Sequence, residues 1–177
     1  MTTSMIWTAR YADAPTLAKL RANPDSIGQF IVGTDVDEEL LDAPADVHNV
    51  AIPFDLDDQW QAIHFLLTGS AEATADPLSI IVGKFEKIGR DQGFGPAWII
   101  PAERILAADA ALSDIDDDTL RERYDPKAMV RHNVYGAKLL AEEGPGGVDF
   151  VMDDVERLRS FLAEGAARGL AALAMIN

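Results

Sequence analysis

The sequence comprises 177 residues, 48% of them hydrophobic, which is enough to bury one hydrophobic core. Its 30 acidic and 15 basic residues give a net charge of -15, and a charge of this sign repels nucleic acid phosphates and anionic membrane surfaces. The absence of cysteine excludes disulfides, thiol nucleophiles and thiolate zinc or iron–sulfur sites.

These properties predict a single domain whose partners, if it has any, are basic or neutral proteins. The N-terminal stretch MTTSMIWTAR lacks the basic region and long apolar run of a secretory leader. No stretch approaches the ~20 apolar residues that a transmembrane helix requires. We therefore expect a cytoplasmic location, with no membrane or nucleic acid partner. The composition leaves the oligomeric state open.

The N-terminal part of the chain predicts short strands and helices in alternation. Apolar, β-favouring residues at 4–10 predict a strand. Residues 14–22 predict a helix with Pro15 in its first turn, which ends before Asn23-Pro24. Three shorter elements are expected after it: a strand at 27–32, an acidic helix at 35–41 and a strand at 49–52.

The clearest single element is an amphipathic helix at 56–69. Asp57 and Asp58 suit its N-cap and first turn, where free N–H groups and the helix dipole favour carboxylates. One face combines the residues at i, i+3, i+4 and i+7, namely Trp60, Ile63, His64 and Leu67. Such a stripe predicts a buried face, and His64 is the one titratable side chain within it.

The remaining part of the chain predicts a small sheet covered by helices. Compact apolar runs of strand length occur at 77–83, 96–100 and 170–176. Helices are expected at 101–112, 119–124, 127–132, 137–142 and 149–168, with a GPGG turn at 144–147 and a Gly169 cap. We predict an α+β fold, in which a small mixed or antiparallel sheet is packed by the central helix and the long C-terminal helix.

No segment matches a catalytic or metal-binding motif. The glycine-rich stretch at 83–95 lacks the spacing of a phosphate loop and is predicted to be a tight connection between strands. The histidines form no HxxxH or HExxH pair; they are His48, His64 and His132. Adjacent aspartates at 57–58, 116–118 and 153–154 are interpreted as helix starts rather than catalytic pairs. We therefore expect no metal and no cofactor.

Several segments together resemble one bacterial family. They are WQAIHFLLTG, PLSIIVG, IGRDQGFGPAWIIP, ALSDI with LRERYDPKAM, and LRSFLAEGAARG. In this order they are similar to the YfbM-like family, a domain of unknown function, and the most specific parts lie at 60–69 and 89–96. The resemblance implies a compact α+β domain with no established activity or cofactor. It draws attention to Trp60, His64, Gly69, Asp91, Gly93, Gly95 and Pro96.

Two functions from different classes remain open. The favoured one is a non-enzymatic acidic binding or interaction module, which would neutralise a basic protein, for example a toxin, through complementary charge. The alternative is a small enzyme or ligand-binding domain with a pocket between the 56–69 helix and the 89–96 loop. There His64 would titrate, Asp91 would orient it and Arg90 would contact an anion. The residues considered for this pocket are Trp60, His64, Arg90, Asp91 and Tyr11. This alternative requires a cleft beside His64 and Asp91 within hydrogen-bonding reach of it.

Overall fold

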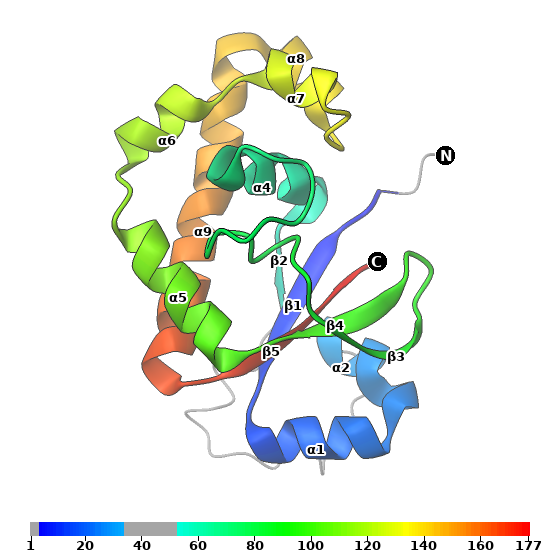
Figure 1. Ribbon diagram of the computed structural model, residues 1–177. Helices are drawn as coiled ribbons and strands as arrows, with labels where there is room; N and C mark the ends of the chain where they lie inside the picture. Colours follow the sequence, from blue (N-terminus) through cyan, green and yellow to red (C-terminus); the bar gives the residue numbers. More distant parts are fainter. Residues whose placement is uncertain (1–3, 34–52) are drawn as a thin grey trace.

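A five-stranded antiparallel sheet lies at the centre of the part of the chain that the computed structural model describes, residues 4–33 and 53–177. The strand order is β2-β1-β5-β4-β3. The strands are β1 (Trp7–Ala12), β2 (Phe54–Asp55), β3 (Glu86–Asp91), β4 (Pro96–Ile100) and β5 (Ala171–Ile176). Trp7 pairs with Ile176, so strands from near the two ends of the chain lie side by side in the middle of the sheet (Figure 1).

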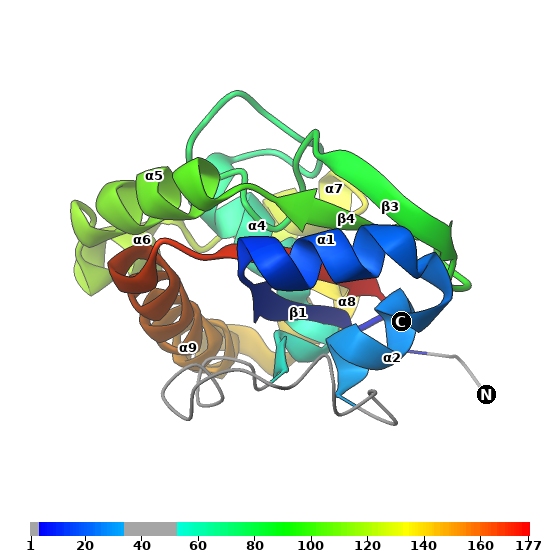
Figure 2. The ribbon, with the colours of Figure 1, turned by 90° about the horizontal axis from the view of Figure 1, so that it is seen from below.

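Helices cover both faces of this sheet. On one face, α1 (Ala14–Ala22) and α2 (Ile27–Val32) pack against Leu173 and Met175 of β5. On the other face, α4 (Trp60–Thr68), α5 (Ala102–Ser113) and α9 (Gly147–Arg168) enclose the larger core with Trp7 and Ala174. Figure 1 shows these two layers, and Figure 2 shows α1 lying across the strands when seen from below.

Three short helices extend the larger layer at one end of the molecule (Figure 1). They are α6 (Asp117–Arg123), α7 (Pro126–Arg131) and α8 (Ala137–Glu143). A 3-10 turn at Gly144–Gly146 then leads directly into α9. The side chains of Asp116 and Asp125 cap α6 and α7 by accepting backbone N–H bonds, so the aspartate at the start of α6 is confirmed as a helix cap.

The predicted α+β class with an antiparallel sheet and a long C-terminal helix is confirmed. The buried stripe of α9 follows a spacing of four, three and four residues, which keeps one face of a 3.6-residue helix toward the sheet. It consists of Val151, Val155, Leu158 and Leu162, each at most 1% exposed. Gly169 ends the helix with a φ of 63°, in the left-handed region that favours glycine.

The strand expected at 27–32 is wrong, because this segment is the helix α2. Its residues Ile27, Phe30 and Ile31 stand at i, i+3 and i+4, and all three are buried against the sheet. Gly33 closes the helix with a φ of 74°. A short apolar run fits a strand and a buried helix equally well, and here packing selects the helix.

The strand expected at 77–83 is also wrong. Leu78, Ile80 and Ile81 are buried in the larger core as predicted, but the backbone turns instead of pairing. Ser79 holds this turn, since its hydroxyl donates to the Val82 carbonyl and accepts from the N–H of Thr74. The stretch at 83–95, predicted as a connection, contains the edge strand β3, so only the residues around 91–96 form the tight turn.

Three sequence predictions fall outside the described residues: the helix at 35–41, the strand at 49–52 and the position of His48. Within the ranges 4–33 and 53–177, the helices are all too short or too polar to cross a membrane.

Candidate functional site

Trp60 lies at the start of α4 and is largely buried. Its indole Nε1 donates a 3.0 Å hydrogen bond to the Met5 carbonyl, and its ring stacks on Tyr135 with 6.1 Å between centroids. The Tyr135 hydroxyl accepts from the N–H of Met5. These contacts tie the residues before β1 to α4 and to the chain before α8, so Trp60 has a packing role.

His64 is completely buried in the next turn of α4. Its Nε2 lies 2.9 Å from the Glu72 carbonyl oxygen, an acceptor only, so Nε2 carries the proton. Nδ1 is buried and has no hydrogen-bond partner. Burial lowers the pKa of His64, partly opposed by the bond to Glu72. The imidazole is therefore held neutral and links α4 to the loop that follows it.

Tyr11 lies on β1 and faces α9. Its hydroxyl donates to the Phe161 carbonyl, and its ring stacks on the Phe161 ring at 4.2 Å. The ring occupies the space that a side chain at Gly165 would need. Burial raises the pKa of Tyr11 above its usual range, so this phenol stays protonated and serves as a strand–helix contact.

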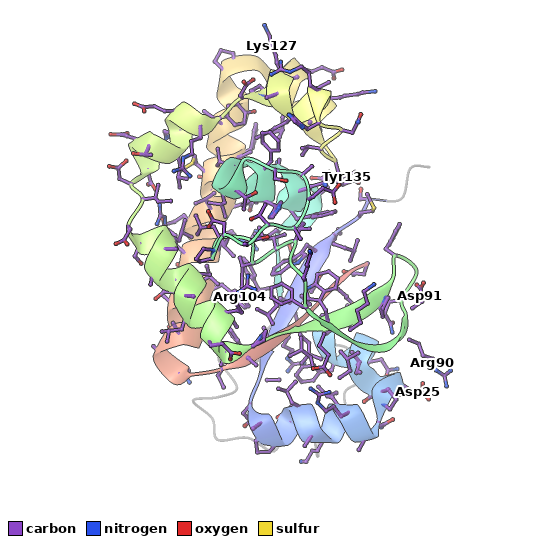
Figure 3. The ribbon with its side chains drawn as sticks, viewed as in Figure 1. Asp25, Arg90, Asp91, Arg104, Lys127 and Tyr135 are labelled. Atoms are coloured by element: carbon purple, nitrogen blue, oxygen red, sulfur yellow. The ribbon has the colours of Figure 1, made fainter. Side chains whose placement is uncertain are left out.

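Arg90 and Asp91 lie on β3, at the hairpin that joins it to β4 (Figure 3). Arg90 forms an exposed ion pair with Asp25, 3.1 Å from its Nε. The Asp91 carboxylate accepts from the backbone N–H groups of Gly93 at 2.7 Å and Gly95 at 3.1 Å. Both glycines have positive φ values, which the carboxylate stabilises in a tight hairpin turn.

The five residues predicted for a pocket are thus placed in three separate parts of the fold. Trp60 and His64 share α4, Tyr11 contacts α9, and Arg90 and Asp91 belong to the β3–β4 hairpin. Among the hydrogen bonds of the described residues, none joins His64 to Asp91. The geometry that the enzyme hypothesis required is therefore not found in these bonds.

A different cluster, absent from the sequence prediction, forms where β2 meets α9. The Phe54 and Phe161 rings stack at 4.5 Å, and the Arg157 guanidinium lies 5.3 Å from the centroid of Phe54. Arg157 also pairs with Asp154 at 2.9 Å and reaches Asp55 at 3.9 Å. We name this cluster the acidic aromatic face. It comprises Phe54, Asp55, Asp57, Asp154, Arg157 and Phe161.

The charges of the acidic aromatic face are unbalanced, because three carboxylates lie beside one guanidinium, which pairs with two of them. The side chain of Asp154 is only 15% exposed, and this burial raises its pKa. Arg157 opposes that rise, whereas the negative charges of Asp57 and Asp55 add to it. Asp57 has no cation partner within 4–33 and 53–177. A second cation at this face would relieve the repulsion.

The interpretation of adjacent aspartates as helix starts holds for Asp57 and Asp58, which lie in the first turn of the 3-10 helix that leads into α4, and is wrong for Asp153 and Asp154. Asp57 lies in a 3-10 turn before α4 and caps neither element with its side chain. Its φ of 50° lies in the left-handed region, which is strained for a residue other than glycine. Asp153 and Asp154 lie a turn or more inside α9, which begins at Gly147. The signal in the sequence was the pair of aspartates at 153–154, which a helix start does not explain.

Residues 4–33 and 53–177 contain no candidate metal centre. No group of three or more histidine, aspartate or glutamate side chains there is arranged to hold an ion. The acidic aromatic face is therefore a set of carboxylates shared by one arginine, with aromatic rings beside it. Such a set can bind cationic groups through charge and ring faces.

Comparisons of the sequence and of the structure with known proteins identify the same family. A family model described as "Domain of unknown function (DUF1877)" matches residues 3–175. Protein YfbM of Escherichia coli (strain K12) is 27% identical over 158 residues, which cover 86% of this chain and 92% of that protein. The crystal structure of YfbM from Escherichia coli, a protein of unknown function, superposes with a TM-score of 0.63 at 21% identity. That match covers 98% of this chain and 99% of the other, and it shows that the two share a fold.

Proposed function

The chain belongs to the family described as domain of unknown function (DUF1877), and from that premise we propose that it is a binding module whose acidic aromatic face takes a basic segment of a protein partner. The observation that carries this proposal is the sharing of Arg157 by two carboxylates, Asp55 and the half-buried Asp154, with Asp57 nearby. An incoming guanidinium or ammonium group would neutralise the charge that Arg157 leaves uncompensated.

The aromatic rings make the same surface suitable for arginine. Phe54 and Phe161 are partly buried and already stacked on each other, so they lose little conformational entropy when a partner binds. Arg157 shows the mode of contact within the protein itself, because it lies over Phe54 while pairing with Asp154. A partner arginine would make the same combination of ring and carboxylate contacts.

The charge of the whole chain supports this class of partner. At -15, the protein attracts basic proteins over several ångströms and speeds their encounter. The attraction weakens with salt, because the Debye length falls from about 10 Å at 0.1 M to about 3 Å at 1 M. The candidate general base gives no comparable support to an enzyme, since His64 is buried and bonded to a backbone carbonyl.

A titration with a defined basic probe tests the proposal. The probe is a fluorescein-labelled nona-arginine peptide, followed by fluorescence anisotropy at about 50 mM salt. In the test variant, Asp55→Asn and Asp154→Asn remove two charges from the acidic aromatic face. In the matched control, Asp114→Asn and Asp118→Asn remove two charges from exposed carboxylates near α6. We expect the Kd to rise at least about tenfold in the test variant and less than about threefold in the control.

Two further measurements separate this proposal from general charge attraction. A nona-lysine peptide should bind more weakly than nona-arginine, because the ammonium group stacks less well on aromatic rings. A pull-down from cognate lysate at low and high salt should recover a basic protein at low salt. Equal losses in both aspartate variants, or no partner at either salt concentration, would contradict the proposal.

A further inference from the structure

The polar and ring contacts that Arg157 makes within residues 4–33 and 53–177 all lie in the acidic aromatic face. Its Nη1 donates to the Asp154 carboxylate at 2.9 Å, and its Nη2 lies 3.9 Å from the Asp55 carboxylate. The guanidinium lies over Phe54, 5.3 Å from the ring centroid. Arg157 is therefore held by the same groups that we propose bind a basic partner.

Arg159, two positions further along α9, is held in a different way. Its guanidinium donates to the backbone carbonyls of Leu112 at 2.6 Å and Ile115 at 2.7 Å, and its side chain is 20% exposed. It therefore ties α9 to the C-terminal end of α5. Arg157 donates to no backbone carbonyl in the described part of the chain, and its side chain is 48% exposed. Arg157 can therefore turn into solvent without breaking a hydrogen bond to the backbone.

The rings beside Arg157 hold one another in place. Phe161 stacks on Tyr11 at 4.2 Å and on Phe54 at 4.5 Å between centroids, with interplanar angles of 15° and 13°. Trp7 meets Phe54 edge-on at 6.2 Å. Arg157 covers a part of Phe54 that this stack leaves open, because two groups cannot occupy the same ring surface. If Arg157 moved away, that ring surface would be open to another cation.

Arg157 and an arginine of a partner require the same position. A guanidinium pairs with a carboxylate through its fork of N–H groups while its flat face lies on a ring. The open surface of Phe54 lies beside the half-buried Asp154, and Arg157 occupies both. An incoming arginine therefore meets a like charge and a covered ring while Arg157 is in place. Once Arg157 has turned into solvent, it meets a carboxylate and an open ring.

We propose, resting on the function proposed above, that Arg157 is an internal competitor of the partner: its guanidinium fills the arginine site of the acidic aromatic face and turns into solvent when a partner arginine binds. A single arginine gains little from this exchange, because it replaces contacts that Arg157 already makes with Asp154 and Phe54. A segment with two neighbouring cations gains more, since the second can pair with Asp57. The exchange therefore selects partners with adjacent basic residues.

A substitution that conserves the charge tests the exchange. Arg157→Lys keeps the positive charge, but an ammonium group stacks less well on a ring and leaves Phe54 more open. Binding of the labelled nona-arginine peptide to the full chain is followed by fluorescence anisotropy at about 50 mM salt. We expect the Kd to fall at least about threefold for nona-arginine and less than about twofold for nona-lysine, which gains less from the ring. The control is Arg121→Lys, since Arg121 is 44% exposed and pairs with Asp149 at 2.8 Å, and both Kd values should stay unchanged.

A second pair of variants removes the charge, and NMR follows the side chain itself. Arg157→Gln and Arg121→Gln each lose one positive charge, so both attract the peptide more strongly. The Kd of Arg157→Gln should nevertheless lie at least about threefold below that of Arg121→Gln. In the nitrogen-15 spectrum of the wild type, the Nε signal of each arginine is assigned by its loss in the lysine variant. Saturation with unlabelled nona-arginine should shift the Arg157 signal and leave the Arg121 signal in place. Thermal unfolding checks that all four variants remain folded.

Two results would overturn the exchange and leave the proposed function standing, provided that the variant with Asp55→Asn and Asp154→Asn loses binding. One is a Kd that Arg157→Lys raises or leaves unchanged, because Arg157 then assists the partner or lies outside the arginine site. The other is an equal response to the substitutions of Arg157 and Arg121. An absence of saturable nona-arginine binding by the wild type and by both Arg157 variants would contradict the exchange and the proposed function together.

Discussion

His64 is predicted to make the stability of the protein depend on pH in a defined range. The imidazole is completely buried, donates from Nε2 to the Glu72 carbonyl and leaves Nδ1 without a partner. Protonation of Nδ1 would place a charge in the core with no acceptor for its proton. The folded state therefore holds His64 neutral, and its pKa lies below the ordinary value of 6.5.

The sign and the size of the effect follow from this lowered pKa. Above the unfolded value of 6.5 both states are neutral, so the stability is fully present. As the pH falls below 6.5, the unfolded chain takes up a proton that the folded chain refuses, and stability is lost until the pH reaches the folded pKa. One group limits the slope to about 1.4 kcal/mol per pH unit. Between pH 7.0 and 5.5 the loss is at most about 1 kcal/mol.

The perturbation is His64→Leu, and the assay is urea unfolding followed by circular dichroism between about pH 5.5 and 7.5. The variant leaves the Glu72 carbonyl without a donor, which lowers the free energy of unfolding by about 1–3 kcal/mol at every pH. It also removes the titrating group, so the pH slope of the wild type should disappear. The control is His132→Gln, since His132 is exposed at the end of α7 and its replacement should preserve the slope. An identical slope in wild type and His64→Leu would refute this reasoning.

Two further pairs of variants test the backbone geometry by thermal unfolding. Gly165→Ala should destabilise the protein by about 1–3 kcal/mol, because its new methyl group would overlap the Tyr11 ring. The control is Gly146→Ala, where a methyl group meets open space and φ is negative, so this variant should be neutral or slightly stabilising. Asp57→Gly should raise the stability by up to about 1 kcal/mol, since it relieves a φ of 50°. Asp58→Gly, inside the 3-10 turn, should lower the stability by about 0.5–1 kcal/mol, and an equal response of both aspartates would contradict the assignment of strain to Asp57.

The elements that could be predicted from sequence are those with a local signal long enough to be unambiguous. The 3.6-residue stripe of α9 spans many turns, and its glycine stop is a local backbone requirement. The central helix was likewise predicted, although its first turn is 3-10 and α4 proper begins at Trp60. By contrast, the runs at 27–32 and 77–83 are short and apolar throughout, so their pattern predicted burial but not conformation.

The candidate sites depended on contacts that no local pattern encodes. Asp55 and Asp154 are 99 positions apart in the sequence and come together only because β2 lies beside α9. At this face, carboxylates from β2 and α9 acquire a shared arginine partner through the tertiary arrangement.

The sequence by itself determined the α+β class, the absence of thiol chemistry, the acidic surface and the burial of the face that carries His64. Hydrophobic periodicity determined the fold class and the buried face because it acts within each element, whereas composition alone determined the charge and the lack of thiols. Only the tertiary structure decided which nitrogen of His64 is bonded, that Asp91 closes a hairpin turn, and which carboxylates share Arg157. Hydrogen bonds and charges act through space, so their partners are known only when separate elements are packed together.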